Sequence, residues 1–81
     1  MTVPQTFLYP NPTNGLVNIK IDTELNNGEL VLLNCFGQKV HEQKIIQGTN
    51  EINIKSISSG LYNYIIFENG QAIGNGKLTK E

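Results

Sequence analysis

The sequence predicts an all-β fold, a small antiparallel β-sandwich of about seven short strands. Two observations support this prediction. Ile, Val and Thr together make up 20 of the 81 residues, whereas the strong helix former Ala occurs once. The dipeptide Asn-Gly, which tolerates the positive φ of tight hairpin turns, occurs four times and indicates repeated chain reversal. A chain of this length builds one thin core, so we expect a single domain.

Alternating or continuously apolar segments place the strands along the chain. Residues 1–6 include Pro4 and lack periodicity, so we interpret them as a linker remnant with Met1 as an added start, ahead of a domain that spans residues 7–81. Strands are expected over residues 7–9, 16–21, 29–34, 39–46, 51–54 and 61–67, with a last strand returning through residue 78. This spacing of short strands and turn signals favours an immunoglobulin-like arrangement.

The apolar pattern also predicts pairing and the core. Residues 30–33 are apolar on both faces, which favours a central strand covered on both sides. A two-residue Asn69-Gly70 turn would pair Phe67 with Ala72 and Ile66 with Ile73. We expect Ile57 to plug into the core from a connection. The expected core residues are Ile19, Ile21, Leu30, Leu32, Ile52, Ile54, Tyr62, Tyr64, Ile65 and Ile66.

Charge and length exclude several classes of function. Six Lys, no Arg and seven acidic residues give a net charge of -1, which provides no basic field for nucleic acid. No apolar run approaches the roughly 18 to 20 residues of a membrane span, and the start does not resemble a signal peptide. Because a core this thin leaves no room for a deep substrate cavity, we expect neither an enzyme nor a cofactor.

Cys35 and His41 each occur once, and a Cys–His pair can act as nucleophile and base. If the turn between their strands has two residues, the parity of the register places the two side chains on opposite faces of the sheet. We therefore interpret Cys35 as a small apolar residue and His41 as a solvated strand residue. A single cysteine also rules out an internal disulfide.

Two further groups of residues can be interpreted either as a binding site or as part of the fold. Residues 22–29 offer oxygen ligands for Ca²⁺, but their glycine falls at the seventh loop position rather than the sixth, so we favour a solvated turn and no metal site. Tyr9, Tyr62 and Tyr64 suggest a sugar-stacking platform, although two of them lie in the most apolar strand, where core packing is favoured. A carbohydrate-binding or adhesion module is the alternative function.

Four short segments, each present once, are informative because of their order and spacing along the chain. They are Tyr-Pro-Asn-Pro-Thr-Asn-Gly at 9–15, Leu-Asn-Cys-Phe-Gly-Gln-Lys-Val at 33–40, Ser-Gly-Leu-Tyr at 59–62 and Gly-Lys-Leu-Thr-Lys at 76–80. With these segments the sequence resembles the C-terminal sorting domain of the type IX secretion system of Bacteroidetes. The resemblance covers residues 8–80. It departs at Leu33, where the family tends to have an aromatic residue, and at Lys77, where members often carry a denser basic cluster.

The resemblance implies a secretion signal that catalyses nothing. A covalently linked upstream passenger would cross the inner membrane, fold in the periplasm and pass the outer membrane because the translocon recognises this domain. A sortase-like peptidase would then cut before Phe7 and either attach the passenger to lipopolysaccharide at the cell surface or release it. The residues that the resemblance assigns to the sorting motif are Pro10, Asn11, Pro12, Gly15, Gly37, Gln38, Gly60, Tyr62, Lys77 and Lys80.

Most of these motif residues also have a physical role in folding. The prolines stiffen the first segment, and the glycines permit bends that other residues resist. A buried Tyr62 hydroxyl needs a local partner. Lys77 and Lys80 are expected as surface charges on an edge strand. Recognition is expected at exposed sheet edges and the terminal strand, so deleting residues 77–81 should abolish export and leave a folded domain.

Overall fold

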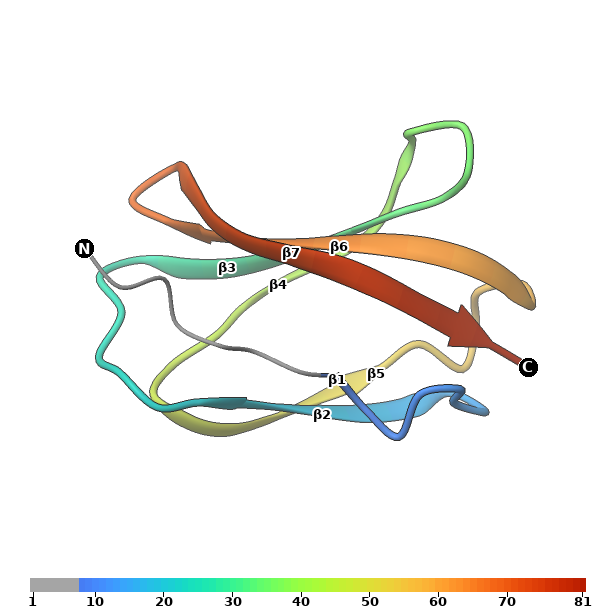
Figure 1. Ribbon diagram of the computed structural model, residues 1–81, viewed down its shortest axis with the longest axis horizontal. Helices are drawn as coiled ribbons and strands as arrows, with labels where there is room; N and C mark the ends of the chain where they lie inside the picture. The colour runs from blue at the N-terminus through green and yellow to red at the C-terminus, as the bar shows by residue number, and fades with distance from the viewer. Residues whose placement is uncertain (1–7) are drawn as a thin grey trace.

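The computed structural model describes residues 8–81, which form seven strands and no helix. The strands are β1 (Leu8–Tyr9), β2 (Leu16–Ile21), β3 (Gly28–Leu33), β4 (Lys39–Lys44), β5 (Gly48–Asn53), β6 (Gly60–Glu68) and β7 (Gln71–Lys80). One antiparallel sheet has the order β1-β2-β5, and the other has the order β4-β3-β6-β7. The sheets face each other as the two layers of a sandwich (Figure 1). The predicted all-β fold is confirmed, and the arrangement is consistent with an immunoglobulin-like fold.

The predicted strand ends differ from the observed ones mainly around the β4–β5 connection. β4 ends at Lys44 instead of residue 46, and β5 begins at Gly48 instead of residue 51. β5 starts early because Gly48 and Thr49 continue the ladder with β2. The expected start of the first strand at residue 7, and the linker expected over residues 1–6, lie outside the described residues.

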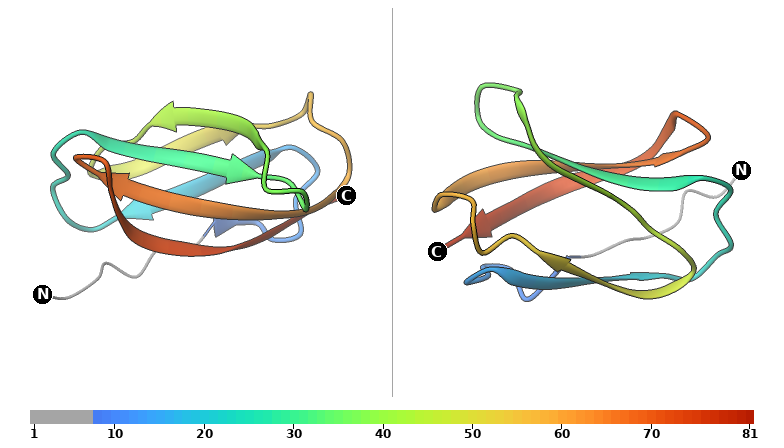
Figure 2. Two further views of the ribbon diagram at one scale, coloured as in Figure 1. Left: turned by 90° about the horizontal axis from the view of Figure 1, so that it is seen from above. Right: turned by 180° about the vertical axis from the view of Figure 1, so that it is seen from behind.

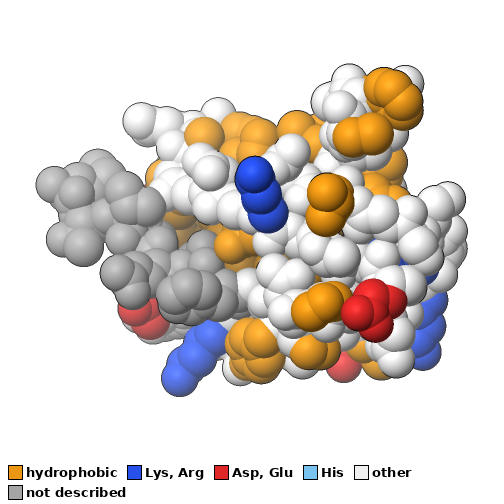
Figure 3. All heavy atoms as spheres, turned by 45° about the vertical axis from the view of Figure 1, so that its right-hand side comes forward, with side chains coloured by type: hydrophobic (Ala, Val, Ile, Leu, Met, Phe, Trp, Pro, Cys, Tyr) orange, Lys and Arg blue, Asp and Glu red, His pale blue; other side chains and the backbone are white. Residues whose placement is uncertain are grey.

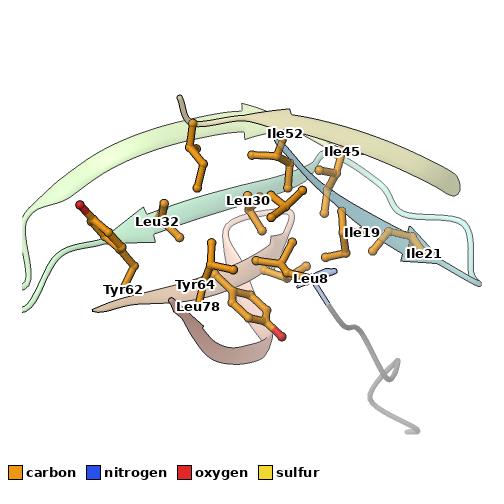
Figure 4. Close-up of a cluster of buried hydrophobic side chains, with 13 residues drawn as sticks. Leu8, Ile19, Ile21, Leu30, Leu32, Ile45, Ile52, Tyr62, Tyr64 and Leu78 are labelled. Atoms are coloured by element: carbon orange, nitrogen blue, oxygen red, sulfur yellow. The ribbon is translucent and has the colours of Figure 1, made fainter. Parts of the chain in front are cut away.

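The core lies between the two sheets, where side chains from both layers point toward one another (Figure 4). Every predicted core residue is buried except Ile65, which is half-buried. Ile65 is opposite Val31 and Asn75 on the outer face of the four-stranded sheet, so the prediction for this residue was wrong. Ile57 packs against the core as expected. Four buried hydrophobic residues were not predicted: Leu8, Val17, Ile45 and Leu78.

The outer face of the four-stranded sheet is less covered than the sequence suggested. β3 is central in its sheet, between β4 and β6. Leu30 and Leu32 are buried in the core, but Val31 and Leu33 are only half-buried. The prediction that both faces of this strand are covered is therefore wrong, because no layer formed by residues 8–81 packs on the outer side.

The β6–β7 hairpin contains the expected turn and an unexpected bulge. Asn69 and Gly70 have positive φ and join strands in which Phe67 pairs with Ala72, as predicted. Ile66, however, pairs with Gly74 instead of Ile73, because the register shifts at this point. The last Asn-Gly dipeptide, at 75–76, lies inside β7 and makes no reversal.

Candidate functional site

The first and last motif segments lie side by side at one end of the sandwich. The Nδ2 of Asn11 donates a hydrogen bond to the Lys77 carbonyl at 3.0 Å, and the Oδ1 of Asn11 accepts one from the Thr79 N–H at 3.0 Å. The amide side chain thereby provides the donor and acceptor that a neighbouring strand would provide. Asn11 therefore covers part of the otherwise open edge of β7.

Thr13 extends this contact to the end of β7. Its N–H donates to the Thr79 carbonyl at 2.9 Å, and its carbonyl accepts from the Glu81 N–H at 2.8 Å. The side chain is 2% exposed, and its Oγ1 accepts from the Gly15 N–H and donates to the Leu16 carbonyl. We call the hydrogen bonds of Asn11 and Thr13 to residues 77–81 the clasp. Figures 1 and 2 show the end of β7 beside the β1–β2 connection that carries it.

Sequence reasoning did not single out Thr13, although a signal for it was present. Thr followed two residues later by a glycine N–H is typical of a turn in which the hydroxyl oxygen accepts a backbone hydrogen bond. Gly15 has a φ of +138°, and a Cβ there would lie 3.0 Å from the Lys55 Cα. The permissive backbone expected at Gly15 is therefore needed both for its dihedral and for this close approach. Pro10 and Pro12 flank Asn11 on the surface.

Lys80 is buried, contrary to the expectation of a surface charge. It is 8% exposed, and its ammonium donates hydrogen bonds to the carbonyls of Lys55, at 3.1 Å, and Ile57. Side chains alternate along a strand, so Lys80 follows Leu78 onto the core side of β7. The long side chain extends past the apolar core to reach these acceptors. Lys77 points to the other face and is exposed, as expected.

The middle motif forms a closed turn around Asn34. The Oδ1 of Asn34 accepts hydrogen bonds from the N–H groups of Phe36 and Gln38, at 3.0 and 2.9 Å. Its Nδ2 donates to the Oε1 of Gln38 at 3.0 Å. Gly37 has a φ of +78°, as the expected reversal requires. Asn34 was not predicted as a site residue, although asparagine at the start of a turn often accepts from the N–H two residues on.

The third motif begins β6 and positions Tyr62. Gly60 is the first residue of β6, and the Tyr62 hydroxyl donates to the Ser58 carbonyl, which is the local partner that burial was expected to require. Tyr62 and Tyr64 are buried in the core, whereas Tyr9 is exposed. The three tyrosines therefore do not form an exposed stacking platform, and this observation counts against the carbohydrate-binding alternative.

The structure contradicts the two-residue turn assumed between the strands of Cys35 and His41, because Leu33 pairs with Lys39 and residues 34–38, which include Cys35, form the connection. Cys35 is exposed. His41 is half-buried opposite the core residue Leu32, with its Nε2 2.8 Å from the Gln43 Oε1. The two side chains do not form a nucleophile–base pair.

Residues 22–29 are held by contacts between two turns. The Asn26 N–H donates to the Glu68 carboxylate at 2.9 Å, and the Asn27 Nδ2 donates to the Asn69 Oδ1 at 2.8 Å. Within residues 8–81 no group of three or more His, Cys, Asp or Glu side chains is placed to hold a metal ion. In the same part of the chain, no helix is long and apolar enough to cross a membrane.

Comparison with known proteins assigns the motif pattern to a family. No curated protein matches the chain. A family model described as the secretion system C-terminal sorting domain matches residues 7–81. The matched range includes the clasp, the Asn34 turn and the buried Tyr62. The chain therefore belongs to the family of type IX secretion system C-terminal sorting domains.

Proposed function

We propose that the export machinery recognises this sorting signal as a folded body, and that the clasp completes this body. A sorting domain of this family implies association with type IX secretion components, an upstream passenger, and an extracellular or cell-surface destination. The observation that carries the proposal is the contact between Asn11 and Thr13 at one end of the chain and β7 at the other. A recognised surface that includes these segments exists only in the folded domain.

The ten motif residues divide into two groups under this proposal. One group shapes the body, because its members are buried or make structural hydrogen bonds; it consists of Asn11, Gly15, Gly37, Gln38, Gly60, Tyr62 and Lys80. The other group is exposed and presents side chains to a partner; it consists of Pro10, Pro12 and Lys77. The motif thus specifies both the shape and part of its surface.

The proposal also includes the route and the processing of the passenger. The passenger crosses the periplasm folded, and a sortase-like peptidase cuts in the linker ahead of Phe7. The position of β1 supports a cut at this place, because β1 lies at the edge of the three-stranded sheet and leads directly into the residues of the clasp. A cut ahead of β1 separates the passenger and leaves the strands of the sandwich together.

A fusion experiment tests the function. Residues 3–81 are placed behind a periplasmic reporter in a Bacteroidetes strain with a working type IX system, and the reporter without the domain serves as the control. We expect the fused reporter outside the cell or on its surface, separated from the domain. A reporter that stays in the periplasm would contradict the sorting function, and an exported but uncut fusion would contradict the peptidase step alone.

A further inference from the structure

Three of the four motif segments meet at a pocket that adjoins the clasp at Lys77. The pocket has a volume of about 250 Å³ and is lined by Cys35, Leu61, Tyr62, Asn63 and Lys77. Asn63 and Lys77 are cross-strand partners whose side chains lie on the outer face of the four-stranded sheet. Cys35 belongs to the turn between β3 and β4, residues 34–38, which rises above this sheet in Figures 1 and 2. We call this segment the raised turn. The raised turn and the sheet together line the pocket, which is open to solvent.

The pocket borders the core residue Tyr62 and also includes apolar groups that are exposed. Leu61 is 70% exposed, and Phe36, next to Cys35 in the turn, is 83% exposed. Large apolar side chains at such exposure are available to a partner, and Phe36 is next in sequence to the pocket residue Cys35. Figure 3 shows hydrophobic side chains at the tip of the raised turn, with a lysine and further hydrophobic side chains on the body below it.

The polar part of the pocket carries one unneutralised positive charge. Lys77 is the charged residue among those that line it, and its ammonium has no hydrogen-bond or ion-pair partner among residues 8–81. Lys39, at the start of β4 on the opposite edge of the same sheet, is instead paired with Glu42 at 3.0 Å. Because a free ammonium lies beside exposed apolar side chains, the pocket is complementary to a group that combines a carboxylate with an apolar neighbour.

We propose that this pocket binds a polypeptide segment of the export machinery in which an acidic residue stands beside an apolar one. The carboxylate would pair with Lys77 and Asn63, and the apolar side chain would pack on Leu61, beside the turn that carries Phe36. The pocket lies on the exposed face of the sheet beside the terminal strand, where a peptide segment of a partner can reach it. The inference rests on the proposed sorting function and adds the site and the chemistry of the partner.

A charge series at Lys77 tests the proposal in the exported fusion. Lys77→Arg should export like the wild type, Lys77→Gln should export about threefold more slowly, and Lys77→Glu about tenfold more slowly, because reversal adds repulsion. Lys20→Glu is the matched control, since Lys20 is an exposed lysine on the other sheet. Thermal unfolding of each purified domain should give the same midpoint, which separates loss of recognition from loss of fold.

A photocrosslinking amino acid identifies the occupant. Placed at position 36, it should crosslink during export to a protein of the secretion machinery, at a peptide that contains Asp or Glu beside an apolar residue. Placed at position 46, where Ile46 is 69% exposed, it should not crosslink to that peptide. A crosslink at position 36 to lipopolysaccharide, or to a peptide without an acidic residue, would overturn the proposal.

The outcomes distinguish this inference from the function on which it depends. If the wild-type fusion is not exported, the sorting function fails and the inference fails with it. If the wild type is exported and the folded Lys77→Glu domain is exported equally fast, the pocket is not the recognition site and the sorting function stands. If Lys77→Glu and Lys20→Glu slow export equally, net charge explains the effect and the inference is likewise overturned.

Discussion

Lys77 and Lys80 belong to the same strand, yet the structure uses them in opposite ways. Lys80 is buried, and its ammonium donates to the carbonyls of Lys55 and Ile57, whereas Lys77 is exposed beside a pocket and its ammonium has no hydrogen-bond or ion-pair partner among residues 8–81. Strand alternation explains the difference, because residues an odd number of positions apart face opposite sides. One short segment therefore supplies a folding contact on one face and a free charge on the other.

The clasp and the raised turn differ in the same way: the groups of the clasp are bonded within the domain, whereas the tip of the turn is exposed. In the clasp, both polar groups of the Asn11 amide and the backbone of Thr13 are satisfied by β7. In the turn, the Asn34 side chain satisfies the backbone, and the tip leaves Phe36 exposed. Hydrogen bonds between groups of the same domain stabilise it, whereas exposed apolar groups are available to a partner.

Deletion of residues 77–81 should have the largest effect on stability. It removes the buried Leu78, the Lys80 contacts and every hydrogen bond of the clasp. Loss of a buried leucine side chain alone costs about 2–5 kcal/mol, and a domain of this size rarely has more than about 5 kcal/mol in total. We therefore expect an unfolded product by circular dichroism, which revises the sequence-based expectation of a folded truncation. Cooperative unfolding at the wild-type urea midpoint would contradict the structure.

Lys80→Met should lower the free energy of unfolding by about 1–3 kcal/mol, because the carbonyls of Lys55 and Ile57 lose their donor at a buried position. Lys77→Met should change it by no more than about 0.5 kcal/mol, as expected for an exposed position. Urea unfolding of the two variants measures the contrast. Equal effects at both positions would show that Lys80 does not hold the end of β7.

Asn11→Ala should cost about 1–2 kcal/mol, because the Lys77 carbonyl and the Thr79 N–H lose their side-chain partners. Asn14→Ala, in the same connection, is the control, since Asn14 is exposed and should be close to neutral. Hydrogen exchange at the Thr79 amide should rise in the first variant and stay unchanged in the second. Unchanged protection in both would mean that Asn11 does not cover the edge of β7.

Local features were predictable because local patterns specify them. The alternation in residues 16–21 and the Asn69-Gly70 turn each depend on a few neighbouring residues, and the structure contains both. The clasp was not predictable in this way, because Asn11 bonds to residues 66 and 68 positions away. No pattern of neighbouring residues specifies such a pairing.

Two errors followed from classifying residues by type instead of by face. Ile65 lies in a continuously apolar run, which hid the alternation that places it on the outer face. Lys80 was assigned to the surface because it is charged, although its spacing from the buried Leu78 places it on the core side. The pocket needed the structure, because its walls come from the β3–β4 turn, β6 and β7.

The smallest change in stability should come from Phe36→Ser. Phe36 is exposed and its N–H, not its side chain, contributes to the Asn34 turn, so the free energy of unfolding should change by no more than about 0.5 kcal/mol. Ile46→Ser provides a matched loss of an exposed apolar side chain at the other end of β4. The two variants should unfold at similar urea concentrations, but only Phe36→Ser should slow export of a fused reporter. If both slow export equally, surface hydrophobicity in general, and not the raised turn, would determine recognition.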